Sequence, residues 1–146
     1  MGVERFDITR HREAALQLGE RMHREAGRVG WNAERFLEVL QQPHAYACLY
    51  RDAAGQCIGG LVGYVYREAQ GLGDLVAQDL GWYVDPEHRG GTAAVRMVRD
   101  FEAWAKSKGA RCVLLAQTTA INVDRTRQWC EALGYTVIGY VTRRML

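Results

Sequence analysis

The stretch VDPEHRGGTAA, residues 84–94, joins an apolar run to a long helical pattern and carries little side-chain bulk at the junction. The run before it, LVAQDLGWYV (75–84), is typical of a strand, and the residues after Thr92 have the spacing of an amphipathic helix. The first backbone N–H groups of a helix have no partner inside the helix and carry partial positive charge, so they attract phosphate. The stretch therefore has two interpretations, a tight turn or a phosphate site at the start of a helix.

Length and composition are those of an ordinary globular protein. The chain has 146 residues, of which 48% are hydrophobic and 25% charged, and its formal net charge is +2. This length favours a single domain, 1–146, and the charge is too small to indicate nucleic acid as a partner. No apolar run approaches the ~20 residues of a membrane span, and the N-terminus lacks the apolar stretch of a signal peptide. We therefore expect a soluble cytoplasmic protein without a membrane partner.

The cysteines and histidines do not have the spacing of a disulfide framework or a metal site. Cys48, Cys57, Cys112 and Cys130 form no CxxC pair, which indicates reduced thiols. The four histidines share no ligand spacing. No metal is therefore expected.

Apolar patterns along the chain predict an α/β fold. Strands are expected at 3–10, 45–50, 57–67, 75–84, 111–118 and 136–145. Helices are expected at 10–26, with Thr9 as its cap, and at 31–42, 92–108 and 122–133. Charged residues of the first helix, such as Arg21 and Glu25, are expected on a solvated face; the alternative is that they recognise the substrate, with the glutamates suited to an amine and the arginines to an acidic group. The order β-α-α-β-β-β-α-β-α-β predicts a mixed sheet, antiparallel early and with a βαβ crossover late.

Two signatures occur in the C-terminal half of the chain. The pattern V-x-P-x-x-R-G-x-G-x-G/A is matched by Val84, Pro86, Arg89, Gly90 and Ala94, and WCEALGY (129–135) is similar to Y-E-K-L-G-F. In this order the chain resembles the GNAT superfamily of acyl-CoA-dependent N-acetyltransferases. The earlier elements also fit, so the resemblance covers essentially the whole chain. It implies a mostly antiparallel sheet with splayed central strands and helices on both faces.

The resemblance also implies where acetyl-CoA binds. Backbone N–H groups of the turn hold the pyrophosphate; the corresponding positions are Arg89, Gly90, Gly91, Thr92, Ala93 and Ala94. The backbone of Trp82 and Val84 pairs with the pantetheine arm like an added strand. The thioester then lies between this strand and CVLLAQT (112–118). A primary amine acceptor enters from the opposite side, under the N-terminal helices and GGLVGYVY (59–66).

Some positions depart from the family pattern. Thr92 replaces a glycine of the turn, and either caps the helix or also donates its hydroxyl to phosphate. Cys130 stands where the family often has the tyrosine that protonates the departing CoA thiolate. A thiol with an ordinary pKa of ~8.5 is able to donate that proton, but it is shorter than tyrosine, and the alternative is a small buried residue. Tyr135 is either a substitute donor or a core aromatic.

Two further residues have open roles. Asn122 lies one position before Val123, where the family's helix tends to have an asparagine, so it either positions CoA or only caps the helix. The carboxylate that often serves the family as general base corresponds to Gln78, which cannot take a proton. Asp79 is adjacent, but strand alternation directs it to the other face unless a bulge intervenes. Its alternative is a surface charge, with water relaying the proton instead.

Two functions are consistent with these residues. One is an N-acetyltransferase that moves an acetyl group from acetyl-CoA to a primary amine by direct attack in a ternary complex. The other is a non-catalytic GNAT-fold module that acts by binding CoA or a protein. The sequence does not identify the amine. The segment 136–146 offers an edge for a homodimer, although a monomer fits the composition equally well.

Overall fold

A computed structural model of the chain describes residues 1–116, 121–139 and 141–145, with the backbone alone for Gln70. The chain divides into two compact units, Met1–Ala116 and Gln117–Leu146.

The larger unit is built on a mixed sheet. Within the described residues the sheet has five strands in the order β1-β2-β3-β4-β5. Their bounds are Gly2–Arg5 (β1), Ala45–Arg51 (β2), Cys57–Arg67 (β3), Leu75–Val84 (β4) and Val113–Leu114 (β5). The first four strands are antiparallel to their neighbours, and β5 is parallel to β4. The predicted mixed sheet is therefore confirmed for five of its six expected strands.

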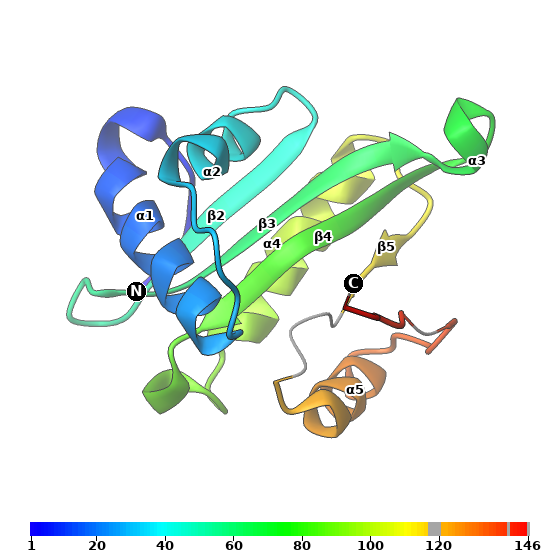
Figure 1. The fold of residues 1–146 in the computed structure, drawn as a ribbon. Helices are drawn as coiled ribbons and strands as arrows, with labels where there is room; N and C mark the ends of the chain where they lie inside the picture. Colours follow the sequence, from blue (N-terminus) through cyan, green and yellow to red (C-terminus); the bar gives the residue numbers. More distant parts are fainter. Residues whose placement is uncertain (117–120, 140, 146) are drawn as a thin grey trace. The chain divides into compact units, whose positions relative to one another are not determined.

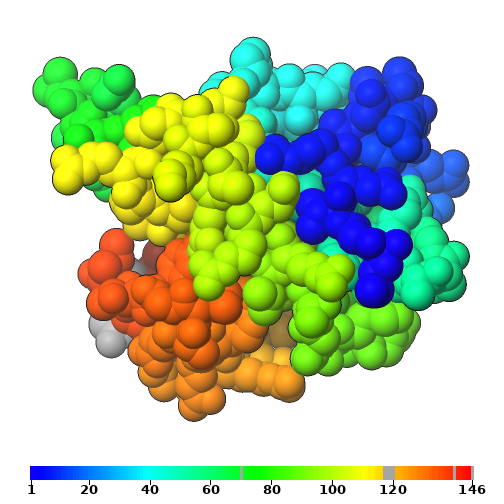
Figure 2. All heavy atoms as spheres, turned by 180° about the vertical axis from the view of Figure 1, so that it is seen from behind, coloured from blue at the N-terminus to red at the C-terminus, as the bar shows by residue number. Residues whose placement is uncertain are grey.

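Helices lie on both faces of this sheet, as predicted. Helices α1 (Ile8–Glu25) and α2 (Ala33–Leu40) cover one face, and α4 (Ala93–Ser107) covers the other (Figure 1). Seen from behind, the side chains of α4 (yellow-green) cover the middle of that second face (Figure 2). Two short helices, α3 (Glu68–Gly71) and the 3-10 helix η1 (Pro86–His88), were not predicted.

The first helix begins at a different cap from the predicted one. Asp7 is the N-cap, and its Oδ1 accepts hydrogen bonds from the backbone N–H groups of Thr9 (2.9 Å) and Arg10 (3.1 Å). The Thr9 hydroxyl donates to the same carboxylate oxygen (2.5 Å). A charged carboxylate is the stronger acceptor for unpaired N–H groups, so the prediction of Thr9 as cap was wrong by two residues.

Glycines in β3 let helices approach the sheet closely on both faces. A Cβ built at Gly60 lies 2.7 Å from Cδ2 of Leu18 in α1. A Cβ built at Gly63 lies 2.6 Å from Cζ of Phe101, a fully buried residue of α4. Any side chain at these positions overlaps a neighbour. The glycines of the predicted strand therefore set the distance of both helix layers.

The smaller unit contains α5 (Val123–Ala132). After its C-cap Leu133, Gly134 has φ +95, and its N–H donates to the Glu131 carbonyl (3.0 Å). The N–H of Tyr135 donates to the Cys130 carbonyl, also at 3.0 Å. This pair of bonds is a Schellman motif, in which glycine takes the left-handed conformation. The LGY part of the second signature is therefore a helix stop.

The last predicted strand, 136–145, is not found in the described part of that segment. Residues 135–139 and 141–145 have no regular secondary structure, and Val137, Ile138 and Val141 are exposed. Apolar alternation makes a strand only where a neighbouring backbone completes the hydrogen bonds, and Gly139 weakens the segment further. The predicted dimer edge at 136–146 remains a prediction.

We predict that Gly63→Ala lowers the free energy of unfolding by about 1–3 kcal/mol, because the added methyl group overlaps Phe101. Gly81→Ala in β4 is the matched control, since its Cβ would meet only Met22 of α1 at 3.6 Å. Urea unfolding of both variants measures the difference. Equal free energies for the two variants would show that Phe101 does not lie against Gly63.

Candidate functional site

Strands β4 and β5 separate soon after they pair. In the part of the chain that the structure describes, β5 pairs with β4 only at Ala77↔Val113 and Gln78↔Leu114. The C-terminal half of β4, which contains Trp82 and Val84, continues beyond that ladder. This is the splay that the resemblance implied.

A β-bulge lies at the same point on the other side of β4. Gly63 of β3 pairs with Asp79, whereas Val62 pairs with Gly81, so Leu80 is the extra residue. A bulge bends its strand and changes the direction of nearby side chains. Asp79 was expected to face away from the site unless a bulge intervened. Such a bulge is present.

Asp79 is buried between β4 and the segment that follows β5. It is 4% exposed, and its Oδ1 accepts a hydrogen bond from the backbone N–H of Ala116 at 2.6 Å. Burial raises the pKa of its carboxyl to about 7, and the bond from Ala116 opposes that rise. Its expected alternative, a surface charge, is therefore wrong. Neighbouring Gln78 is occupied differently: its side-chain oxygen accepts a bond from the Tyr66 hydroxyl (2.9 Å).

The turn after β4 leads directly into α4. Gly90 has φ +92, which favours glycine, and a Cβ at Gly91 would have only the His88 carbonyl oxygen near it, at 3.5 Å. Thr92 is the N-cap of α4 by position, but its side chain makes no capping hydrogen bond. The expected capping by the Thr92 hydroxyl is therefore wrong. The helix start, with Ala93 and Ala94, carries no side-chain cap on its first N–H groups.

Arg89 of the turn is held by α1. Its two terminal nitrogens donate to the Glu25 carboxylate (2.7 and 2.5 Å), and its Nε donates to the Val84 carbonyl (2.8 Å). The bonds from Arg89, and a further one from the Tyr83 hydroxyl, lower the pKa of Glu25 against the effect of burial. Arg89 and the Val84 carbonyl are thus engaged within the protein.

A second ion pair joins α1 to the start of the turn. Arg21 donates from Nε and a terminal nitrogen to the two carboxylate oxygens of Asp85 (2.9 and 3.0 Å), and also to the Cys57 carbonyl (3.1 Å). Asp85 is buried. The expectation that Arg21 and Glu25 lie on a solvated face was therefore wrong. Their i, i+4 spacing places both on one stripe of α1, and each pairs with a different residue of the segment that follows β4.

The remaining predicted residues lie in the smaller unit. Asn122 is the N-cap of α5 by position, with φ 48, and makes no side-chain cap bond. Cys130 is half-buried on α5, and Tyr135 follows the glycine that ends this helix. These three residues therefore lie at the two ends and on the body of one helix.

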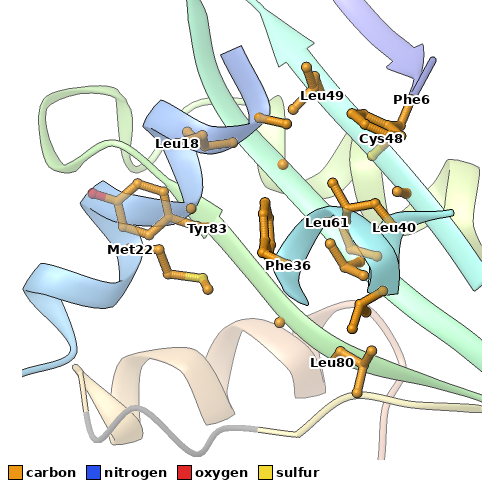
Figure 3. Close-up of a pocket in the computed structure, with 17 residues that line it drawn as sticks. Phe6, Leu18, Met22, Phe36, Leu40, Cys48, Leu49, Leu61, Leu80 and Tyr83 are labelled. Carbon is orange, nitrogen blue, oxygen red and sulfur yellow. The ribbon is translucent and has the colours of Figure 1, made fainter. Parts of the chain in front are cut away.

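A cavity of about 170 Å³ lies between α1, α2 and the sheet. The side chains that point into it come from both helices and from β4; they include Leu18, Met22, Phe36, Leu40, Leu80 and Tyr83 (Figure 3). None of the residues that line it is charged. It occupies the place where the resemblance put the amine acceptor.

The described residues contain neither a metal cluster nor a membrane-spanning helix. No group of three or more His, Cys, Asp or Glu residues among them is arranged to hold a metal ion. No helix within the described ranges is long and apolar enough to cross a membrane.

Comparison with solved structures finds the same fold in several proteins. A mutant of the BH1408 protein from Bacillus halodurans is 16% identical, with a TM-score of 0.79 over 100% of this chain and 99% of that chain. Ribosomal-protein-alanine N-acetyltransferase from Brucella melitensis biovar Abortus 2308 is 19% identical, with a TM-score of 0.75 over 99% and 100% of the two chains. Aminoglycoside N-acetyltransferase AAC(6')-Iy in complex with CoA is 19% identical, with a TM-score of 0.79 over 99% and 93%.

Comparison by sequence shows the family. No curated protein matches the chain. Residues 15–135, however, match the acetyltransferase (GNAT) family. This range includes the C-terminal part of α1, the splayed strands, the glycine turn and the helix that ends in LGY. The chain therefore belongs to the GNAT acetyltransferase family.

Proposed function

We propose that the protein transfers an acetyl group from acetyl-CoA to a primary amine by direct attack in a ternary complex. The observation that carries this proposal is the glycine turn at the end of β4, followed by the uncapped start of α4. Family membership supports the reaction type, and AAC(6')-Iy, which has the same fold, is in complex with CoA.

The turn is the proposed site for the CoA pyrophosphate. Backbone N–H groups of Gly90, Gly91 and Thr92 and of the first turn of α4, Ala93 and Ala94, would bind its oxygens. The geometry fits, since the Gly91 position is open and the Thr92 side chain does not cap the helix. Because Arg89 is paired with Glu25, its proposed role is to position the turn.

The strand before the turn would hold the pantetheine arm. Trp82 and Val84 lie on β4 beyond its pairing with β5, as an added strand of ligand requires. The Val84 carbonyl accepts a bond from Arg89, which holds this end of the strand next to the turn. A role of Asn122 in positioning CoA remains a prediction from the sequence.

Asp79 is the proposed general base. The amine nitrogen attacks the thioester carbonyl carbon, the C–N bond forms, the C–S bond breaks, and its electron pair stays on sulfur. Before it attacks, the ammonium must lose one proton to Asp79, directly or through water; a second proton leaves the nitrogen as the amide forms and balances the proton that the thiolate takes up. A base is most effective when its pKa is near the working pH, and burial holds the pKa of Asp79 at about 7.

Cys130 is the proposed general acid for the departing thiolate, with Tyr135 as the substitute donor. A thiol of ordinary pKa, ~8.5, is able to protonate a thiolate of similar basicity. Both residues lie at the C-terminal part of α5 and the glycine stop that follows it.

A cytoplasmic location is also proposed. Its support is that none of the four cysteines takes part in a disulfide, as is usual in reducing compartments. Homodimer formation through 136–146 remains a prediction from the sequence.

The CoA site is tested by Gly91→Asp, which places a negative charge beside the proposed pyrophosphate. We predict that the dissociation constant of CoA rises about tenfold or more, because like charges in close proximity repel. Gly91→Asn is the matched control of equal shape and should change affinity much less. Gly91 is preferred over Gly90, where φ +92 strains any other residue. Titration calorimetry measures the dissociation constant of CoA for each variant. A wild-type value for Gly91→Asp would disprove the site.

The base is tested by the pH dependence of the rate. We predict that kcat/KM of the wild type rises with pH through about 7, as Asp79 ionises. Asp79→Asn should lose this rise and fall by about 10²–10⁴-fold, the usual contribution of a general base. CoA affinity, measured in parallel, should stay unchanged. A variant that keeps both the rate and its pH profile would assign the proton transfer to solvent.

The same substitution has a predicted effect on stability. Because burial raises the pKa of Asp79 above its ordinary 3.8, the folded protein holds this proton more tightly than the unfolded chain. That stabilisation is complete below pH 3.8 and is lost as pH rises to about 7. Over this range the contribution of Asp79 to the free energy of unfolding falls by up to about 4 kcal/mol. Urea unfolding should therefore show the wild type losing stability relative to Asp79→Asn between pH 5 and 7, and a constant difference above pH 8. A difference that does not depend on pH would mean that Asp79 is ionised throughout.

The acid is tested by Cys130→Ala and Tyr135→Phe, each measured by release of free CoA thiol. We predict a fall in kcat of about tenfold or more for Cys130→Ala, with CoA affinity retained. Tyr135→Phe should leave the rate within about twofold if Cys130 is the donor. Acetyl-CoA binding by the wild type without any thiol release, over a panel of amines and peptides, would favour the alternative, a non-catalytic GNAT-fold module.

A further inference from the structure

The described lining of the cavity under α1 and α2 has no charged side chain. Its lining comes from α1, α2 and strands β2, β3 and β4, together with Phe6 at the end of β1, and contains no Asp, Glu, Lys, Arg or His. Among the described residues of the lining, only Tyr83 has a hydroxyl, and it bonds to Glu25. A ligand in this space therefore gains from apolar contact and finds few hydrogen-bond partners.

Two carboxylates on or next to elements that line the cavity are paired within the protein. Glu25 at the end of α1 is paired with Arg89, and Asp85 after β4 is paired with Arg21. A ligand with several ammonium groups needs carboxylates in place of the water that it loses on binding. The lining described above contains no carboxylate. A polycationic acceptor does not match this cavity.

The size of the cavity matches one ring. A cavity of 150 Å³ lined by Leu, Ile and Phe in another protein binds benzene. Here about 170 Å³ is lined by Leu, Met, Phe and Val side chains (Figure 3). A benzene ring or a branched aliphatic group of similar volume fits this space.

The cavity adjoins the bulge that contains the proposed base. Leu80 and Gly81 line it and directly follow Asp79 along β4. A molecule with its apolar group in the cavity and its amine at the bulge needs only a short link between the two. This geometry matches a small amine with one or two carbons between nitrogen and ring.

We propose that the acceptor is a small primary amine that carries one aromatic ring or one branched aliphatic group, and that this group occupies the cavity. The proposal rests on the acetyl transfer proposed above and names its substrate class. An acyl chain longer than acetyl is the competing occupant. It is disfavoured because neither β5 nor residues 115–116, which border the expected thioester position, contribute to the lining.

The experiment compares two amines that share a two-carbon chain, 2-phenylethylamine and ethanolamine, with kanamycin as the polycation. With acetyl-CoA and the full chain, kcat/KM for 2-phenylethylamine should exceed that for the other two by at least about tenfold. Equal values for all three amines, or a preference for kanamycin, would overturn the proposal. A preference for 3-methylbutanoyl-CoA over acetyl-CoA, with no preference among amines, would show that the acyl chain occupies the cavity instead.

Gly81→Val narrows the cavity. A Cβ at Gly81 would meet the flexible end of Met22 at 3.6 Å, so Val fills space without displacing backbone. We predict that KM for 2-phenylethylamine rises about tenfold, while kcat/KM for ethanolamine stays within about threefold. An equal loss for both amines would show that the residue acts on the reaction rather than on the apolar group.

Leu80→Ala is a second variant that does not depend on how well Gly81→Val folds. Leu80 is 53% exposed, so its truncation is tolerated, and the enlarged cavity should shift the preference towards a two-ring amine such as tryptamine. An unchanged preference would contradict the proposal.

Binding of 2-phenylethylamine without acetyl-CoA, followed by ligand-observed NMR, separates this inference from the proposed function. Binding that Gly81→Val weakens supports the cavity even if no acetyl transfer is detected. Transfer to amines without such binding would leave the acetyltransferase intact and disprove the cavity as its acceptor site.

Discussion

Strand β4 changes its hydrogen-bonding partners on both sides at Asp79. On one side its ladder with β5 ends at Gln78, and on the other a bulge at Leu80 interrupts its pairing with β3. If the parallel ladder continued, the Ala116 N–H would bond to the backbone of β4; it donates instead to the Asp79 carboxylate. One irregularity therefore lies next to a buried carboxyl and next to Leu80 and Gly81, which line the cavity.

Helix α1 connects the two sides of the proposed site. Leu18 and Met22 form part of the cavity wall, and Arg21 and Glu25 of the same helix hold the turn that leads into α4. Such pairs contribute little net stability when their desolvation is counted, but leaving one partner unpaired is costly. Their effect is therefore to fix geometry: α1 cannot shift over the proposed acceptor cavity without also disturbing Asp85 and Arg89.

The parts of the fold that depend on local sequence were predictable. The bounds of β4 were correct because an apolar run ends at a proline turn, and α4 was placed by its apolar stripe and its terminal glycine. The bulge at Leu80 was not predictable, since register belongs to a pair of strands rather than to either one. The Arg89–Glu25 pair was not predictable either, because it also depends on two segments: it joins residues 64 positions apart. The expected strand at 136–145 shows the converse limit, since its local pattern forms no strand in the described residues 136–139 and 141–145.

Desolvation ties the proposed base to the proposed substrate. Burial disfavours the charged form of any group, so it raises the pKa of a carboxyl and lowers that of an amine. In Asp79 this brings the pKa to about 7. An amine drawn out of water by an apolar group in the adjoining cavity undergoes the opposite shift. The two values converge, and a proton then passes from ammonium to carboxylate at little cost in free energy. An apolar acceptor cavity beside a buried carboxyl is thus a way to generate a neutral, nucleophilic amine near neutral pH without a strong base.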